Sequence, residues 1–284
     1  MRRLFLLLST LVLCSCVRPD LPGGNEPEVK AETIRILAIG NSFSADAVEQ
    51  YLWELFAAAG IPAVIGNMSA SGSDLSYHWN RYLNGAAEYH YFKRSKRMHL
   101  KQEGKTFLEC LGDEKWDVIS LQQASGLSGM HDTFFPYLPD LMAVVGNLTE
   151  AEIVFHQTWA YPANSTQAAF ANYGNNQETM YEAIVDAVTR AAAECGIQTV
   201  IPVGTAVQNA RVFGFGDTLN RDGLHLELTY GRFLAACVWY EKLSGRNVEE
   251  NPYRPASVSE KTAALCRQAA HRACLHPYEI TPIN

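Results

Sequence analysis

Several features that would assign a function at once are absent from this 284-residue sequence. Its seven cysteines form no C-x-x-C motif and no Cys/His cluster at zinc spacing, so neither a zinc site nor a dithiol redox site is predicted. The apolar run at residues 4–13 is too short to span a bilayer as a helix. Basic residues gather only at residues 93–97, and the net charge is −7, which argues against a nucleic-acid-binding protein.

The amino terminus has the pattern of an exported protein. Arg2 and Arg3 precede the apolar run, and Leu-Cys-Ser-Cys follows at residues 13–16. A basic start, a short apolar core and a small-residue exit are typical of a signal peptide. Residues 13–16 resemble a bacterial lipobox, so we expect residues 1–15 to be removed, Cys16 to be lipidated and the protein to be anchored to the cell envelope, at the outer membrane or the cell surface. The alternative is an ordinary signal peptide cut a few residues later.

The rest of the chain divides into a tether and one domain. Residues 16–31 contain three prolines and two glycines among charged residues, without apolar periodicity, which predicts a flexible tether. Residues 32–284 suit one large domain with ample apolar content for a core. Five cysteines remain in it, and because this number is odd, at least one thiol is free or pairs elsewhere.

Apolar runs and helical patterns alternate along this domain. Strands are predicted at residues 33–39, 63–68, 118–121, 153–155 and 199–203, and helices at 45–59, 137–145, 178–195, 230–243 and 259–274. This alternation predicts an α/β fold, a three-layer α/β/α sandwich around a mostly parallel sheet. The polar-aromatic segment at residues 89–101 breaks the alternation and suggests an inserted hairpin. In such sheets the functional loops follow the carboxyl ends of the strands.

A serine follows the first predicted strand. Gly40-Asn41-Ser42-Phe43-Ser44 stands where that strand ends and a helix begins. A serine in such a turn is well placed to be a nucleophile, because the amino terminus of the helix favours developing negative charge. The alternative is that Ser42 or Ser44 only caps the helix.

A second candidate group lies near the carboxyl terminus. His225 is the only one of the eight histidines with an aspartate three positions earlier, at Asp222. On a turn of helix the two side chains would face the same way, and the carboxylate would hold the imidazole in the tautomer that accepts a serine proton. A surface polar pair or a helix cap is the alternative.

Together these two blocks resemble the first and last blocks of the SGNH (GDSL-like) hydrolase superfamily, G-D-S-L and D-x-x-H. The whole pattern is most similar to a family of SGNH-like bacterial lipoproteins with unassigned function. The resemblance implies a flavodoxin-like SGNH fold, with Ser42 as nucleophile, His225 as base and Asp222 as its charge partner. Asn41 replaces the usual Asp, which is not the base in the family.

The resemblance also implies an oxyanion hole. Gly72, in Ser71-Gly72-Ser73, matches the glycine whose backbone N–H contacts the oxyanion, and Gln122 stands where the family has an Asn donor. Gln123 is the second candidate for that donor. Because neighbouring side chains on a strand face opposite ways, the two cannot easily share the role.

We therefore expect a serine esterase that removes O-acetyl groups, with carbohydrate esters as the favoured substrates. Trp159 and Tyr161, after the fourth strand, are candidates for a sugar-stacking wall, and packing of their loop against the core is the alternative. The mechanism requires no metal and no cofactor, and the lipid is the only expected membrane contact. A lipid or acyl-ester hydrolase, and a non-catalytic glycan-binding lipoprotein on the same scaffold, are the competing hypotheses.

Overall fold

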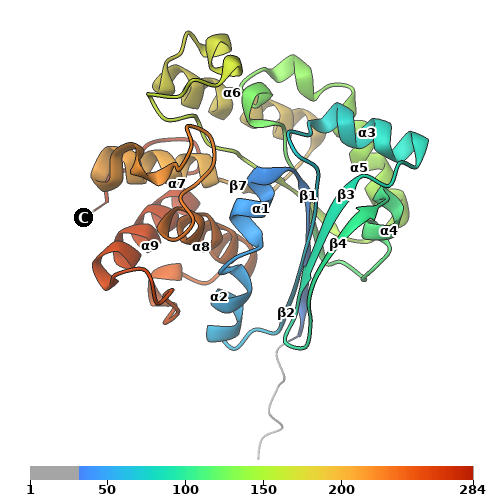
Figure 1. Cartoon of the computed structure of the whole chain (residues 1–284), viewed down its shortest axis with the longest axis horizontal. Helices are drawn as coiled ribbons and strands as arrows, with labels where there is room; N and C mark the ends of the chain where they lie inside the picture. The colour runs from blue at the N-terminus through green and yellow to red at the C-terminus, as the bar shows by residue number, and fades with distance from the viewer. Residues whose placement is uncertain (1–31, 284) are drawn as a thin grey trace, which may run out of the picture. The chain divides into compact units, whose positions relative to one another are not determined.

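The computed structural model describes residues 32–283, which form a seven-stranded sheet between two layers of helices (Figure 1). The strand order is β4-β3-β2-β1-β5-β6-β7. β1, β2, β5, β6 and β7 are parallel, whereas β3 and β4 are antiparallel additions at one edge. The strands are β1 (Ile34–Gly40), β2 (Ala63–Ser69), β3 (Tyr89–Arg94), β4 (His99–Lys105), β5 (Val118–Leu121), β6 (Glu152–His156) and β7 (Val200–Ile201).

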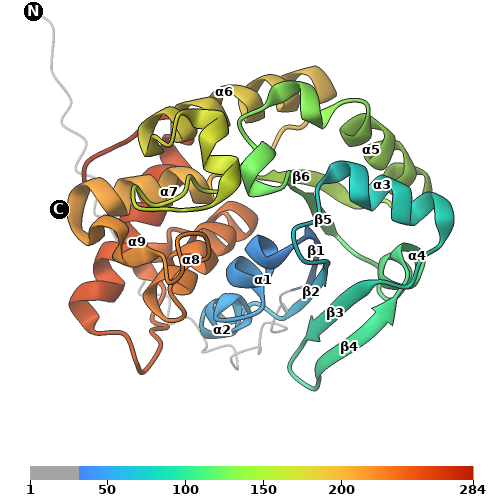
Figure 2. The ribbon, with the colours of Figure 1, turned by 45° about the horizontal axis from the view of Figure 1, so that its top comes forward.

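Helices cover both faces of the sheet (Figures 1 and 2). One layer contains α1 (Ser42–Val48), α2 (Leu52–Ala58), α7 (Val203–Ala210), α8 (Tyr230–Ser244) and α9 (Glu260–Leu275). The other contains α3 (Leu75–Asn84), α4 (Phe107–Leu111), α5 (Tyr137–Leu148) and α6 (Gln177–Cys195). The predicted α/β/α sandwich with a mostly parallel sheet is thereby confirmed.

The central strand β1 positions the candidate serine. Its residues 36–39 are all fully buried, because helices cover the sheet on both faces. β1 pairs in parallel with β2 through Gly40 and Ser69, and with β5 through Ala38 and Ser120. The loops that follow these three strands therefore meet at one edge of the sheet, as the sequence predicted.

The predicted helix at residues 45–59 is two helices. α1 ends at Val48 and α2 begins at Leu52, and between them Tyr51 adopts a left-handed conformation with φ 72°. The Tyr51 ring is buried and meets Phe233 edge to face. Tertiary packing therefore stabilises the break between α1 and α2. No glycine or proline at this position predicts the break from the sequence.

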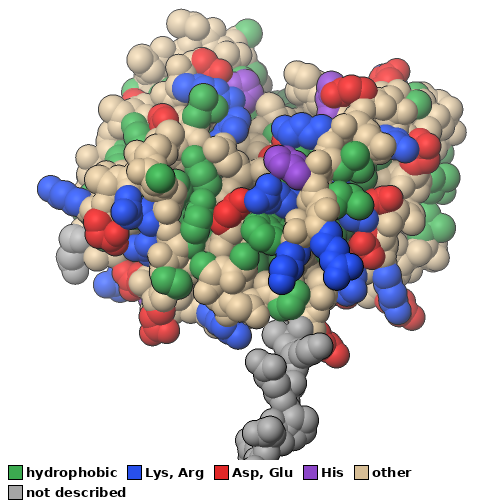
Figure 3. Space-filling view, turned by 60° about the horizontal axis from the view of Figure 1, so that its bottom comes forward, with side chains coloured by type: hydrophobic (Ala, Val, Ile, Leu, Met, Phe, Trp, Pro, Cys, Tyr) green, Lys and Arg blue, Asp and Glu red, His purple; other side chains and the backbone are tan. Residues whose placement is uncertain are grey.

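The antiparallel edge corresponds to the predicted inserted hairpin. β3 and β4 are joined by a short turn and pair from Arg94 and His99 to Tyr89 and Lys105 (Figure 2). On the face seen in Figure 3, Lys and Arg side chains lie interspersed with Asp and Glu. The hairpin extends the sheet beyond β2 and forms one of its edges.

The signal peptide, the tether and Cys16 lie outside the described residues. Among residues 32–283, no helix is both long and apolar enough to cross a membrane. In the same part of the chain, Cys110, Cys195, Cys237, Cys266 and Cys274 are free thiols, each buried or half-buried. Burial raises the pKa of Cys110 to about 12, which leaves that thiol unreactive at neutral pH.

Candidate active site

Ser42 is the first residue of α1 and lies directly after β1. The helix is capped by Asn41, whose side-chain oxygen accepts a hydrogen bond from Phe43 N at 2.9 Å. Ser42 is half-buried, and its backbone N–H has no partner inside the helix because it belongs to the first turn. Asn41, and not Ser42 or Ser44, is thus the helix cap, which leaves the Ser42 hydroxyl free for another contact.

That contact is His225, 183 residues further along the chain. Ser42 Oγ lies 2.8 Å from His225 Nε2, and His225 Nδ1 lies 2.8 Å from Asp222 Oδ2. Because the carboxylate can only accept, Nδ1 carries the imidazole proton and Nε2 accepts from the serine hydroxyl. The structure therefore brings the three predicted residues together in the order that nucleophilic catalysis by serine requires.

Asp222 and His225 meet across a turn, not along a helix as the spacing suggested. Asp222 Oδ1 accepts from His225 N at 2.7 Å and from Leu224 N at 3.2 Å, which is an Asx turn. Gly223 inside this turn has φ +74°, a conformation that side chains rarely adopt. The local sequence thus presets the orientation of the carboxylate toward the imidazole.

The carboxylate of Asp222 is stabilised in its ionised form. Partial burial would raise its pKa, but hydrogen bonds from the His225 backbone and imidazole outweigh this effect and hold the pKa below its usual value. Asp222 therefore stays charged at neutral pH and can stabilise an imidazolium that forms during proton transfer.

A buried carboxylate that the sequence analysis missed connects the two halves of the site. Asp46 lies one turn after Ser42 on α1 and is 1% exposed. It accepts hydrogen bonds from Leu226 N at 2.9 Å, from Arg221 Nη1 at 3.0 Å and from Arg232 Nε at 2.9 Å. Arg221 and Leu226 flank the Asp222–His225 turn, so Asp46 fixes that turn relative to the serine helix.

Two cavities border Ser42. The loop cavity, of about 340 Å³, is bordered by Asn41, Ser42, Phe43, Ser71, Gly72, Asp74, Ala124, Ser125, Gly126, Leu127, Tyr161, Ala169, Leu224 and His225. The hairpin cavity, of about 310 Å³, lies toward β3 and β4 and is bordered by Ser42, Ala45, Glu49, Ser69, Ser71, His90, Tyr91, Phe92, Lys101, Gln102 and Glu103. Ser42 and Ser71 border both cavities, so the hydroxyl is accessible from either side.

Gly72 lies at the edge of the loop cavity, as an oxyanion donor should. It has φ +66°, and no atom lies within 4 Å of the place where a Cβ would be. Its N–H makes no hydrogen bond to any other residue in the described range 32–283. The Gly72 and Ser42 backbone N–H groups are therefore both available to a developing oxyanion.

The structure does not support the predicted oxyanion role of Gln122. Its side chain is 2% exposed, borders neither cavity, donates to Asn41 Oδ1 at 3.0 Å and accepts from His156 Nδ1 at 2.9 Å. Gln123 is no substitute, because its side chain is bonded to Leu75 N and the Thr133 carbonyl. Gln122 instead orients Asn41, and through it the turn that carries the serine.

Two buried histidines, both uncharged, support the turn between β1 and α1 that carries Ser42. Burial lowers the pKa of His156, the partner of Gln122, to about 3. Burial lowers the pKa of His78 to about 4, and its Nε2 lies 3.2 Å from Ser73 Oγ, which donates to the Gly40 carbonyl. Both imidazoles are neutral at neutral pH, so they serve as hydrogen-bonding supports and not as proton carriers.

We predict that Gln122→Ala lowers the free energy of unfolding by about 1–3 kcal/mol, because it leaves buried His156 Nδ1 without an acceptor and removes one of the two donors to Asn41 Oδ1. The turnover number should fall by less than the hundred- to thousandfold that loss of an oxyanion donor typically costs. Urea unfolding and steady-state kinetics measure the two effects, with Gln198→Ala at an exposed position as the control. If Gln122→Ala leaves the free energy of unfolding unchanged but lowers the turnover number a hundredfold, Gln122 is an oxyanion donor after all.

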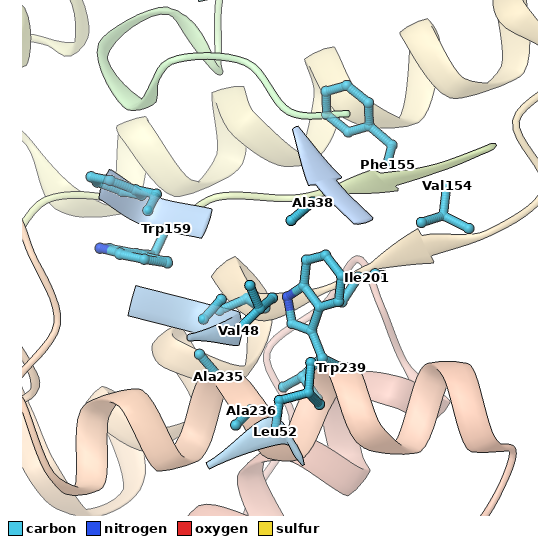
Figure 4. Packing of buried hydrophobic residues seen from close by; sticks show 14 of the residues in the cluster. Ala38, Val48, Leu52, Val154, Phe155, Trp159, Ile201, Ala235, Ala236 and Trp239 are labelled. Carbon is cyan, nitrogen blue, oxygen red and sulfur yellow. The ribbon is translucent and has the colours of Figure 1, made fainter. Parts of the chain in front are cut away.

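Trp159 packs in the core and is not part of a sugar-stacking wall. It is fully buried, stacks on Phe43 with 4.0 Å between ring centroids and donates to the Leu224 carbonyl at 3.0 Å. Figure 4 shows it among the other buried hydrophobic residues. Tyr161 borders the loop cavity but is only 3% exposed, and its hydroxyl bonds Ser125, so its ring face is not free for stacking. The packing alternative is therefore the correct one.

No group of three or more potential metal ligands occurs among residues 32–283. The arrangement around Ser42 has the parts that acyl transfer needs, namely a nucleophile, a base, a carboxylate that orients the base and two free backbone donors.

Residues 35–273 match the model of a family described as Domain of unknown function (DUF4886). A DUF4886 family protein from Bacteroides uniformis is 47% identical, and the match covers 89% of this chain and 98% of that one, with a TM-score of 0.87. No curated protein matches this sequence.

Two further solved structures are similar at lower identity. A proposed SGNH hydrolase from Slackia heliotrinireducens is 23% identical over 75% of this chain and 100% of that one, with a TM-score of 0.54, which shows an SGNH-like fold. An acetyl-xylooligosaccharide esterase variant from Geobacillus stearothermophilus is 14% identical over 74% of this chain and 94% of that one. Its TM-score is 0.49.

Proposed function

We propose that this chain, which belongs to the DUF4886 family, is a serine esterase that hydrolyses O-acetyl esters of carbohydrates. The observation that carries the proposal is the pair of 2.8 Å contacts from Ser42 Oγ to His225 Nε2 and from His225 Nδ1 to Asp222. Residues so far apart in sequence are held in this order by buried contacts, above all those of Asp46.

In the first half of the reaction, Ser42 Oγ attacks the ester carbonyl carbon while His225 Nε2 takes the hydroxyl proton. The negative charge on the carbonyl oxygen is stabilised by the backbone N–H groups of Ser42 and Gly72. The bond from carbonyl carbon to alcohol oxygen then breaks, and His225 returns its proton to the departing alcohol. Asp222 stabilises the imidazolium while it carries that proton.

In the second half, water replaces the alcohol. His225 takes a proton from the water, which attacks the acyl-enzyme, and the resulting tetrahedral intermediate releases the carboxylic acid. The proton on His225 returns to Ser42 Oγ, so the enzyme is regenerated without any external reductant, oxidant or cofactor.

The test of this function is a comparison of ester classes. The purified protein should hydrolyse acetylated sugars and 4-nitrophenyl acetate with kcat/KM at least about tenfold above that for the corresponding long-chain palmitoyl ester, because the cavities beside Ser42 hold only about 310 and 340 Å³. Release of acetate and of 4-nitrophenol is measured. Preference for the palmitoyl ester would favour a lipid esterase, and binding of glycans without any turnover would favour the non-catalytic hypothesis.

We further propose that the protein is exported and anchored by a lipid on Cys16, from the lipobox-like residues 13–16. In cells that express the full chain, labelled palmitate should be incorporated into the protein, which should fractionate with membranes. Cys16→Ser should abolish both, whereas Cys14→Ser should abolish neither. Incorporation that survives Cys16→Ser unchanged would contradict lipidation at this residue.

A further inference from the structure

The hairpin cavity adjoins Ser42 but plays no part in the chemistry described above. Ser42 and Ser71 border both this cavity and the loop cavity. An ester whose carbonyl carbon lies at Ser42 Oγ can therefore extend in two directions, with one part of the substrate in each cavity. The character of the two walls indicates which part enters which cavity.

The most firmly held polar group of the hairpin cavity is the carboxylate of Glu49, at the end of α1. Its Oε1 accepts from Asn67 Nδ2 at 2.8 Å, and its Oε2 accepts from Lys101 Nζ at 3.0 Å. Asn67 is itself fully buried, and its side-chain oxygen accepts from Ser44 Oγ at 2.8 Å. A buried amide thus fixes Glu49 from behind, while Lys101 reaches it from β4.

Further polar side chains border this cavity. Glu49 forms an ion pair with Lys101, and the His90 ring contacts the Glu103 carboxylate across the hairpin. The amide of Gln102 adds a neutral donor and acceptor. Such a wall offers several donors and acceptors, so it suits a ligand with many hydroxyl groups.

The loop cavity has a different wall near the serine. The apolar side chains that border it, together with the two proposed oxyanion donors, are Phe43, Ala124, Leu127, Ala169 and Leu224. Its polar side chains include Asp74, which caps α3 through Tyr77 N, and Ser125 and Tyr161, whose hydroxyls bond each other. Small and apolar side chains there suit a short acyl group. The loop cavity therefore holds the oxyanion donors and apolar side chains beside the serine, whereas the hairpin cavity holds Glu49, Lys101 and Gln102.

We propose that the hairpin cavity is the subsite for the sugar part of the ester, with Glu49 accepting from a sugar hydroxyl and Lys101 donating to one. This inference rests on the proposed esterase function and adds to it the side chains that recognise the alcohol. The inserted β3–β4 hairpin is then a specificity element, because it supplies Lys101 and completes a wall that the parallel sheet alone lacks.

The test uses two acetyl esters that differ only in the alcohol, 6-O-acetylglucose and 4-nitrophenyl acetate. Glu49→Gln and Lys101→Met should each lower kcat/KM for 6-O-acetylglucose by about 10- to 100-fold, mainly through KM, as expected for loss of hydrogen bonds to a charged group. The loss on 4-nitrophenyl acetate should be at least about tenfold smaller. Lys105→Met is the matched control, because Lys105 is also on β4 but borders neither cavity.

Equal losses on both esters would overturn the subsite, since they would mean that Glu49 and Lys101 only support the serine helix. Unchanged kinetics on both would overturn it too. The sugar subsite can be tested independently of the esterase function. Calorimetry measures binding of 6-O-acetylglucose to the Ser42→Ala variant, and this binding requires no turnover. If Ser42→Ala binds 6-O-acetylglucose and Glu49→Gln in that background weakens the binding, the sugar subsite is supported even when the wild type hydrolyses neither ester. If Ser42→Ala does not bind 6-O-acetylglucose, the proposed subsite is wrong.

Discussion

Ser42→Ala should lower kcat for acetyl esters by about 10⁶-fold, to the level that binding and the oxyanion donors alone provide. The substitution removes the only atom that can form the acyl-enzyme, whereas it leaves the half-buried position with a smaller side chain and no unsatisfied buried partner. The melting temperature should therefore stay within a few degrees of the wild type. Initial rates over a wide range of enzyme concentration measure the residual activity.

His225→Ala should cost nearly as much, and the double variant should lose little more than either single one, because a nucleophile and its base act as one unit. Ser95→Ala, in the turn between β3 and β4, removes a hydroxyl that borders neither cavity and should keep full activity. A Ser42→Ala protein that keeps more than about a tenth of the wild-type rate would exclude Ser42 as the nucleophile.

Asp222→Asn should lower kcat by about 10⁴-fold with little change in KM. The amide can donate to Nδ1, which would favour the imidazole tautomer with its proton on Nε2, the nitrogen that must accept from Ser42. The Asx turn can survive, because the amide oxygen still accepts from His225 N and Leu224 N. The loss is thus one of electrostatics and tautomer, not of fold.

The lowered pKa of Asp222 bears on the pH dependence of the wild-type rate. A carboxylate with a depressed pKa stays ionised as the pH falls from neutral into the mildly acidic range, so protonation of Asp222 should not limit the wild-type rate there. Asp132→Asn, at an exposed carboxylate, is the control. An Asp222→Asn variant with kcat within tenfold of the wild type would contradict the assigned role.

The sequence predicted the parts of the site that depend on local order. The β-branched run before Gly40 predicted a buried strand, and the serine that follows was therefore expected at the carboxyl edge of the sheet. The three-residue spacing of Asp222 and His225 was informative because any tight turn brings such neighbours together. The segment from Asp222 to His225 is an Asx turn and not a helix, and the three-residue spacing alone does not distinguish the two.

The parts that the sequence did not predict depend on contacts between distant segments. Asp46 looks like any acidic residue on a helix until the chain brings Arg221 and Leu226 to it from about 180 positions away. Gln122 follows its strand where a donor was expected, but its partners Asn41 and His156 come from two other strand ends and turn its amide away from the cavities. Trp159 in a loop near the site could have faced solvent, and only its stack on Phe43 places it in the core.

Covalent labelling with a fluorophosphonate tests the central claim most directly. Ser42 Oγ should displace fluoride from phosphorus, with His225 taking the hydroxyl proton, and so form a stable phosphonyl ester. Mass spectrometry of the digested protein should find one adduct, on the peptide that contains Ser42, and none in Ser42→Ala. His225→Ala should label far more slowly. No adduct on the folded protein, or an adduct that persists in Ser42→Ala, would contradict the assignment of Ser42 as an activated nucleophile.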